Sequence, residues 1–244
     1  MTRGALIISH GQPSDPGPVE ADLAGLADRV AALLPDWRVG SATLAAAGSL
    51  DRAVAELGAG GRAYPLFMAG GWFTRARLPQ RLAEAGGSGW RVLEPLGCDP
   101  AVHDLAARIV GTAGAEEGGA DRVLLAAHGS FESRVPADIA RHVAGLIERA
   151  TGVPAEARFI DQAPRLSGAA GFGPGSVCLP FFASEGGHVT LDIPAALREA
   201  GFQGRLLPAV GLHPDIPQII ARAIASGDPV CASRCKWQSG GSSD

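Results

Sequence analysis

The stretch LPFFASEGGHVTLDIP, residues 179–194, repeats an earlier stretch of the same chain, YPLFMAGGWFTRARLP, residues 64–79. The two align without a gap 115 residues apart, and Pro194 falls on Pro79. Each begins with an apolar run, continues through a pair of glycines and ends in a proline-containing segment, which is the order expected of a strand, a turn and a helix start. The repeat indicates that one strand–loop–helix unit occurs twice.

Two further blocks recur in the same order at nearly the same spacing. LEPLGCDPAVHDLAARIV, residues 93–110, resembles LPAVGLHPDIPQIIARAI, residues 207–224, and His10 corresponds to His128. Three blocks in constant order, at offsets of more than a hundred residues, are typical of a duplicated domain and not of a short solenoid repeat. The sequence therefore predicts two halves with the same architecture.

Within each half, short apolar runs alternate with segments of helical spacing. The expected strands are 4–9, 37–44, 62–68, 90–94, 122–127, 155–160, 177–183 and 204–208. The expected helices are 19–34, 49–57, 76–86, 100–111, 135–150, 190–200 and 214–226. This alternation predicts an α/β protein made of two doubly wound parallel-sheet lobes, related by internal duplication, that face a central cleft.

The lobe boundary is expected in the small-residue stretch GTAGAEEGGAD, residues 111–121. The predicted division is an N-terminal lobe over 1–116, a C-terminal lobe over 117–227 and a cysteine-containing tail over 228–244. We expect the active site in the C-terminal lobe and a degenerate counterpart in the N-terminal one.

Composition excludes several classes of function for the 244-residue chain. Its 46% hydrophobic and 19% charged residues are those of an ordinary soluble protein, and its net charge of −4 argues against nucleic acid or an anionic membrane as a partner. The sequence has no apolar run of the ~18–20 residues that a membrane span needs, so a cytoplasmic location is expected. It also lacks the G-x-x-x-x-G-K-[ST] and G-x-S-x-G motifs of nucleotide-binding loops and hydrolases.

Histidines follow the strand ends where ligands bind in parallel sheets. His10 and His128 each end the first strand of a half, and Glu185 and His188 follow the third strand of the second half. Because the first and third strands are expected neighbours, His128, His188 and Glu185 are predicted to converge. Two imidazoles and a carboxylate suit a divalent metal such as Co²⁺, Ni²⁺, Fe²⁺ or Zn²⁺, and an imidazole also accepts protons near neutral pH.

The first half has lost this set. Gap-free alignment places Phe73 opposite His188, whereas alignment on the glycines places Trp72 there, and neither side chain can bind a metal or accept a proton. Arg77 stands opposite Asp192, and Gly70 stands opposite Glu185. One site, in the second half, is therefore predicted.

The resemblance that these motifs carry is to a known family. The HG loops after both first strands, HGS at 128–130 and HGQ at 10–12, the segment P-x-F…GGH-x-x-x-D-I-P and the block LG-x-x-P resemble the sirohydrochlorin chelatases of the CbiX and SirB type. These are class II chelatases and relatives of ferrochelatase. The resemblance covers residues 4–226 in a two-repeat form. It implies a lyase that inserts Co²⁺, or Fe²⁺, into sirohydrochlorin for cobalamin or sirohaem biosynthesis without nucleotide hydrolysis. Cobalt is favoured because the two-repeat form resembles the cobalt enzymes.

The resemblance also implies roles for individual residues. The family's two signature histidines match His128 and His188, one as proton acceptor and one as metal ligand, with Glu185 as second ligand or proton relay; which histidine has which task stays open. Residues expected to contact the tetrapyrrole are His10, Trp72, Phe73, Arg75, Arg77, Ser130 and Asp192. Trp72 and Phe73 would form an apolar wall against the macrocycle, and Arg75 and Arg77 would pair with its peripheral carboxylates. The alternative is that these residues only pack a loop that has lost its function. His10 could be a third ligand, a metal-delivery site or a relic.

Other interpretations remain open at this stage. A non-catalytic metal or tetrapyrrole carrier is the alternative function, and the chain is expected to be a monomer or a homodimer. The tail contains Cys231 and Cys235, which are too few for one chain to hold an iron–sulfur cluster there. A cluster shared between subunits, a metal-handling pair, a redox couple or an inert tail are the possibilities.

Overall fold

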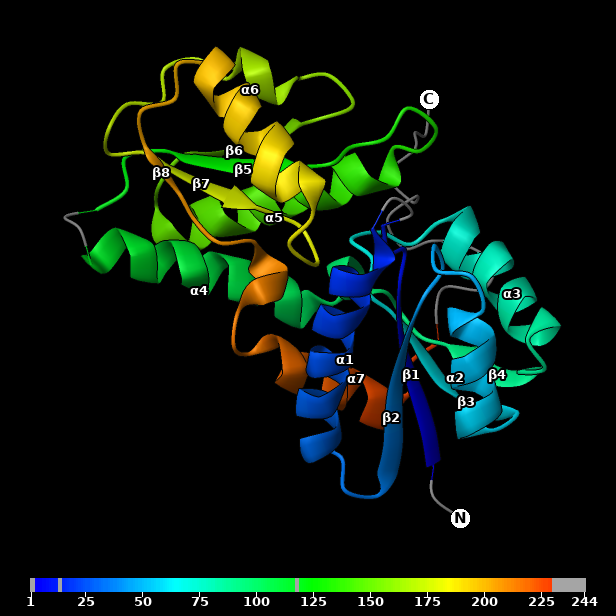
Figure 1. Ribbon diagram of the computed structural model, residues 1–244. Coiled ribbons are helices and arrows are strands. Elements are labelled where there is room, and N and C mark those ends of the chain that lie inside the picture. The colour runs from blue at the N-terminus through cyan, green and yellow to red at the C-terminus, as the bar shows by residue number, and fades with distance from the viewer. Residues whose placement is uncertain (1–2, 13–14, 117–118, 230–244) are drawn as a thin grey trace, which may run out of the picture. The chain divides into compact units, whose positions relative to one another are not determined.

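The computed structural model describes residues 3–12, 15–116 and 119–229, which form two compact units (Figure 1). The first unit contains the described residues up to Cys98 together with those from Pro214 onward, and the second contains Asp99–His213. Cys231 and Cys235 lie outside the described residues.

Each unit contains a four-stranded parallel sheet of the same topology. In the first unit the order is β2-β1-β3-β4, and in the second it is β6-β5-β7-β8. The strands are β1 (Arg3–Ser9), β2 (Trp37–Thr43), β3 (Gly60–Pro65), β4 (Gly89–Val92), β5 (Val123–Ala127), β6 (Ala155–Phe159), β7 (Val177–Pro180) and β8 (Arg205–Leu206). The predicted fold class, two doubly wound parallel sheets related by duplication, is confirmed.

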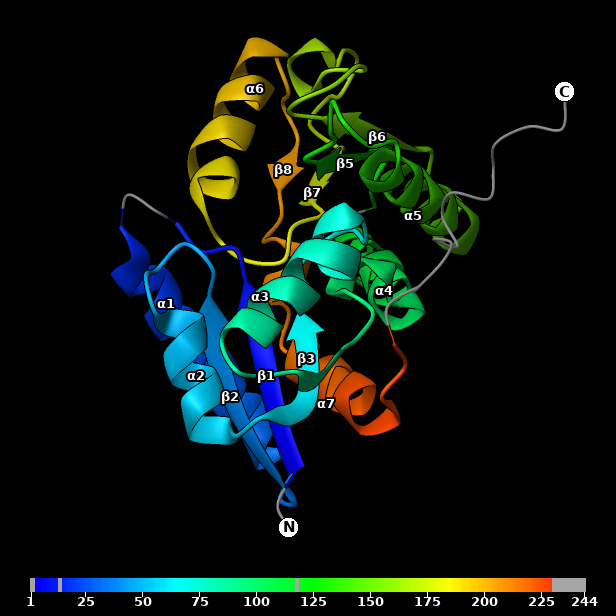
Figure 2. The same ribbon diagram turned by 90° about the vertical axis from the view of Figure 1, so that its right-hand side faces the viewer.

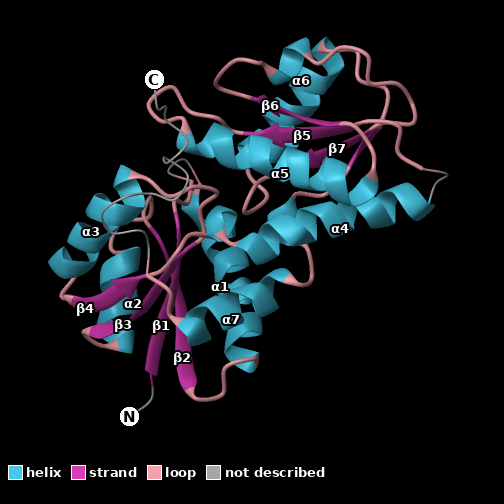
Figure 3. Cartoon of the chain, turned by 180° about the vertical axis from the view of Figure 1, so that it is seen from behind, coloured by secondary structure: helices cyan, strands magenta, loops and turns pink. Residues whose placement is uncertain are grey.

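Helices cover both faces of each sheet. In the first unit α1 and α7 contact each other on one face, and α2 and α3 contact each other on the other (Figure 2). In the second unit α4 and α5 cover one face and α6 the opposite one (Figure 3). The helices are α1 (Pro16–Ala32), α2 (Ser49–Leu57), α3 (Leu78–Glu84), α4 (Pro100–Glu116), α5 (Val135–Thr151), α6 (Ile193–Glu199) and α7 (Ile216–Ser226). No helix of the described chain is both long and apolar enough to cross a membrane.

Burial of the central strands explains why they read as continuous apolar runs. The side chains of Ala5–Ile8 in β1 and of Val123–Ala126 in β5 are fully buried, because helices pack on both faces of these strands. β5 pairs with β6 on one side and with β7 on the other, so Ala127 lies beside Phe159 and Ala126 beside Pro180. The expected adjacency of the first and third strands is confirmed, and the carboxyl ends of three strands meet.

The last long helix of each sequence half packs against the sheet formed by the other half: α4 belongs to the second unit and α7 to the first. α4 packs on α5, and α7 packs on α1 and β3. The compact units therefore do not coincide with the predicted ranges 1–116 and 117–227. α4 also continues to Glu116, into the predicted linker, since burial of Val110 and Ala113 carries the helix through a glycine-containing stretch that propensity alone would end.

A close backbone approach pins the chain beyond β7. The N–H of Gly211, in the 3₁₀ turn Val210–Leu212, donates to the carbonyl of Phe182 at 2.9 Å. A Cβ at Gly211 would lie 2.1 Å from the carbonyl oxygen of Ala183. Gly97 makes the same approach to Met68 in the first unit, so the duplication preserves the contact.

Replacing Gly211 with alanine forces this backbone apart. We expect Gly211→Ala to lower the free energy of unfolding by about 2–3 kcal/mol, measured as a shift of the urea unfolding midpoint. The matched control is Gly173→Ala, where an added Cβ meets nothing within 4 Å. Equal stability of the two variants would contradict this account of the contact.

Candidate functional site

Two histidines meet at the carboxyl edge of the second unit's sheet. His128 directly follows β5, and His188 begins the π-helical turn η4 (His188–Asp192) that leads into α6. Their Nε2 atoms lie 3.2 Å apart, and the ring planes are nearly perpendicular at 89°. Both side chains are accessible, with exposed fractions of 44% and 47%. The structure thus brings together the two histidines that the sequence singled out.

A carboxylate lies on the far side of each imidazole. Asp161 Oδ2 lies 3.1 Å from Nδ1 of His128, and Asp192 Oδ2 lies 2.7 Å from Nδ1 of His188. The carbonyl oxygen of Gly129 also lies 3.1 Å from Nδ1 of His128, and a carbonyl can only accept. These contacts assign a proton to each Nδ1 and turn both Nε2 lone pairs toward each other. The two rings can then share one proton or bind one cation between them.

Local backbone geometry produces this arrangement. Asp161 follows β6, and its N–H donates to the carbonyl of His128 at 3.0 Å, which fixes the two loops side by side. Gly129 has a φ of +76°, and a Cβ there would lie 2.7 Å from Cγ of Gln162. The π-helical turn places Asp192 four residues after His188 and within hydrogen-bond distance of its ring; such turns are rare and occur often at functional sites.

An aromatic side chain borders the imidazole pair. The ring centroid of Phe182, which follows β7, lies 6.4 Å from that of His128 and 6.3 Å from that of His188. Phe182 itself is buried and belongs to the core cluster that includes Val189 and Ile193. The rings are therefore positioned by the core on one side and open to solvent on the other.

The first unit contains the matching elements without the matching chemistry. Its π-helical turn, η1 (Phe73–Arg77), begins at Phe73 as η4 begins at His188, so the gap-free alignment is the structural one. Phe73 packs against Phe67 with ring centroids 5.3 Å apart. The N–H of Ala45 donates to the carbonyl of His10, which is the bond that Asp161 makes to His128. Ala45, His10, Phe73 and Arg77 therefore stand where the second unit has Asp161, His128, His188 and Asp192.

Other predicted residues of the first unit have individual partners. Nδ1 of His10 lies 3.2 Å from the carbonyl of Gly11, as in the second unit. Trp72 is exposed, Nε of Arg75 donates to the carbonyl of Gly71, and Arg77 donates to Oε1 of Gln80.

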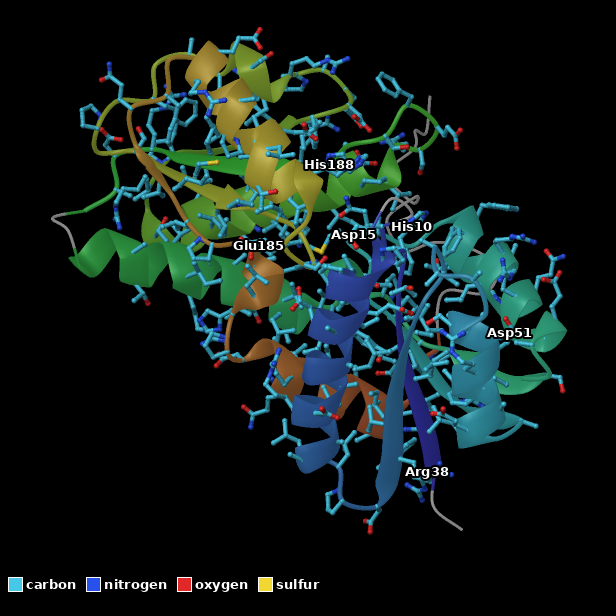
Figure 4. All side chains as sticks on the ribbon, in the orientation of Figure 1. His10, Asp15, Arg38, Asp51, Glu185 and His188 are labelled. Carbon is cyan, nitrogen blue, oxygen red and sulfur yellow. The ribbon has the colours of Figure 1, made fainter. Side chains whose placement is uncertain are left out.

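Two predicted residues of the second unit do not contact the imidazoles. Glu185 is exposed, and Figure 4 shows it well separated from His188 although only two residues lie between them. The Ser130 hydroxyl oxygen accepts bonds from the N–H groups of Glu132 and Ser133, so it shapes the loop that follows His128. The carboxylates that reach the rings are Asp161 and Asp192.

The sequence analysis missed Asp161. A polar residue directly after the strand next to β5 was the available signal, since the carboxyl ends of neighbouring parallel strands share one edge.

Among the described residues no group of three or more histidine, cysteine, aspartate or glutamate side chains is arranged to hold a metal ion. Cys98 and Cys178 are buried, and burial raises the pKa of the Cys178 thiol well above its usual range.

Comparisons with known proteins match this fold and region. The family model described as CbiX matches residues 122–226, which contain the histidine pair. A solved structure described as CbiX, the terminal enzyme for biosynthesis of siroheme in denitrifying bacteria, is 44% identical over 92% of this chain and 99% of that chain, with a TM-score of 0.86.

More distant solved structures share the fold. SirB from Bacillus subtilis with Fe³⁺ is 15% identical over 93% of this chain and 95% of that chain, with a TM-score of 0.69. DR2241 from Deinococcus radiodurans, described as a multi-domain protein with structural similarity to chelatases, is 19% identical over 92% of this chain and 55% of that chain, with a TM-score of 0.67. A search of curated proteins finds no significant match.

The contact between Asp161 and His128 predicts a measurable effect on cation binding. Asp161→Ala removes the acceptor that orients His128, so the affinity for Co²⁺ should fall about 10–100-fold, measured by calorimetric titration. Asp161→Asn keeps an oxygen acceptor and should lose less. Asp138→Ala, which removes a carboxylate paired with arginines on α5, is the control and should leave Co²⁺ affinity unchanged. Unaltered affinity in Asp161→Ala would contradict the orienting role.

Proposed function

Because this chain belongs to the CbiX family, we propose that it is a sirohydrochlorin chelatase, a lyase that inserts a divalent metal ion into the macrocycle without nucleotide hydrolysis. The observation that carries the proposal is the set Asp161–His128–His188–Asp192, with both Nε2 atoms turned toward each other at 3.2 Å. Two predictions of the sequence analysis stay predictions: that the protein acts in the cytoplasm, and that its active form is a monomer or a homodimer.

Metal insertion requires two pyrrole N–H protons to leave the macrocycle while the metal enters it. An imidazole whose Nδ1 proton is held by a carboxylate is a good acceptor at Nε2, because the carboxylate stabilises the imidazolium that forms. His128 and His188 each have such a carboxylate. One ring can therefore take the two protons in turn, passing the first to solvent before it accepts the second, while the other ring holds the metal; both rings are accessible to solvent. Asp161 and Asp192 act in place of the predicted relay through Glu185.

The separation of the two nitrogens also suits a bound cation. With metal–nitrogen bonds of about 2.0–2.1 Å, two nitrogens 3.2 Å apart subtend roughly 100° at the metal, close to a tetrahedral angle. Two protein donors fill only part of a coordination shell, so the macrocycle nitrogens can take the remaining positions. A pair of this kind can hold a metal and then release it to the substrate.

The choice of metal lies between Fe²⁺ and Co²⁺, since imidazole binds both. The family resemblance of the two-repeat form favours cobalt, whereas the 44% identical relative is described as an enzyme of siroheme biosynthesis. We therefore propose Fe²⁺ as the physiological metal and Co²⁺ as a second substrate. Competition between equal concentrations of the two ions, read from the absorbance of the two products, distinguishes them.

The remaining predicted residues have supporting roles in this proposal. Trp72 offers an exposed aromatic surface, and Phe73, Arg75 and Arg77 shape its loop. His10, whose unit has Ala45 at the position of Asp161, is proposed to contact substrate without accepting its protons. In the second unit, Ser130 shapes its loop and Asp192 acts through His188.

Removing either imidazole tests the proposal. His128→Ala and His188→Ala should each lower the metallation rate of sirohydrochlorin by about 100-fold or more, followed under anaerobic conditions by visible absorbance. His142→Ala, on the exposed face of α5, is the matched control and should retain full activity. An active His128→Ala/His188→Ala double variant would refute the mechanism. Binding of sirohydrochlorin by the unmodified protein without multiple turnovers would instead identify a carrier.

A further inference from the structure

Two exposed apolar residues follow the paired histidines closely in sequence. Among the large hydrophobic residues of the second unit, Phe131 and Leu191 are the two most exposed, at 77% and 68%. Each lies three residues after one of the paired histidines, His128 and His188. Isolated exposed apolar residues are common on protein surfaces, but these two stand on the segments that carry the paired imidazoles, which makes them candidates for contact with a ligand bound there.

Phe131 is displayed on a loop with a fixed shape. The N–H of Ser130 donates to Oε1 of Gln162 at 2.7 Å. The hydroxyl oxygen of Ser130 accepts hydrogen bonds from the N–H groups of Glu132 and Ser133. The Cα atoms of His128 and Phe131 are at most about 11 Å apart, because only two residues lie between them. The ring is therefore exposed on the same short loop that carries His128.

Arg165 completes this surface. Its guanidinium lies 5.9 Å from the ring centroid of Phe131, and Nη1 donates to the carbonyl of Ile160 at 2.6 Å. Arg165, like Arg149 and Arg198 of the same unit, forms no ion pair with any described residue, but Arg165 alone of these three lies against Phe131. A guanidinium has five N–H donors, so most of those of Arg165 are available for a carboxylate from outside the protein.

We propose that Phe131, Leu191 and Arg165 bind the rim of the macrocycle, and this inference rests on the proposed function. Phe131 and Leu191 contact its apolar surface, and Arg165 pairs with a peripheral carboxylate. The ligand class is a flat tetrapyrrole with ionised side chains. Asp161, Gln162 and Arg165 all belong to one segment, so that segment serves His128, the following loop and the substrate rim.

Arginine and aromatic substitutions test this inference through substrate affinity. Arg165→Gln should raise the KM for sirohydrochlorin about tenfold, the effect of losing a charge-assisted hydrogen bond. Arg165→Lys keeps the charge but not the planar fork, so it should lie between Arg165→Gln and the unmodified protein. Phe131→Ala should raise KM about fivefold to tenfold. Arg198→Gln, at an exposed arginine of α6, is the matched control and should leave KM unchanged.

Two further measurements separate this inference from the proposed function. Co²⁺ affinity measured without macrocycle should be the same in all four variants, because none of them alters the imidazoles or their carboxylates. Binding of metal-free uroporphyrin, a porphyrin with carboxylates around its rim, should weaken in Arg165→Gln and not in Arg198→Gln.

Specific outcomes would overturn the inference. If the unmodified protein metallates sirohydrochlorin and Arg165→Gln and Phe131→Ala keep its KM, this binding surface is wrong while the proposed function stands. If the unmodified protein binds Co²⁺ but neither binds uroporphyrin nor metallates sirohydrochlorin, the proposed function fails and this inference fails with it.

Discussion

Parallel pairing of β5 with β6 on one side and β7 on the other is the constraint on which the site depends. Because all three strands end at the same edge, the residues that follow them meet there: His128 after β5, Asp161 after β6, and Phe182 and η4 after β7. The backbone bond from Asp161 to His128 and the glycine contact at Gly211 keep these loops in place. The chemistry is supplied by a few side chains, but their convergence is a property of the sheet.

The two units show what the shared fold requires and what it does not. Both have a glycine with positive φ after the first strand's histidine, a π-helical turn after the third strand and a close glycine–carbonyl approach beyond it. Those features survive in the first unit although Ala45 and Phe73 have replaced the functional side chains. The π-helical turn is therefore a feature of the backbone architecture, and it does not depend on an ion pair such as that of His188 with Asp192.

Much of this could be predicted from the sequence, because repeats and hydrophobic periodicity report on local structure and on burial. They predicted both sheets, the adjacency of first and third strands, and the histidine pair. They did not predict Asp161, since a carboxylate after an edge strand looks like any polar loop residue until the register of β6 with β5 is known. They also placed Glu185 beside His188 because it is near in sequence, whereas the turn carries it away.

The exchange of terminal helices has a consequence for the history of the duplication. α4, from the first half of the sequence, covers the second sheet, and α7, from the second half, covers the first. A chain of half this length would be left with its last helix unplaced and with one face of its sheet covered by a single helix instead of two. Two such chains could each place their last helix on the sheet of the other and so form an intertwined homodimer. Fusion of the two genes would then yield this architecture without repacking its interior.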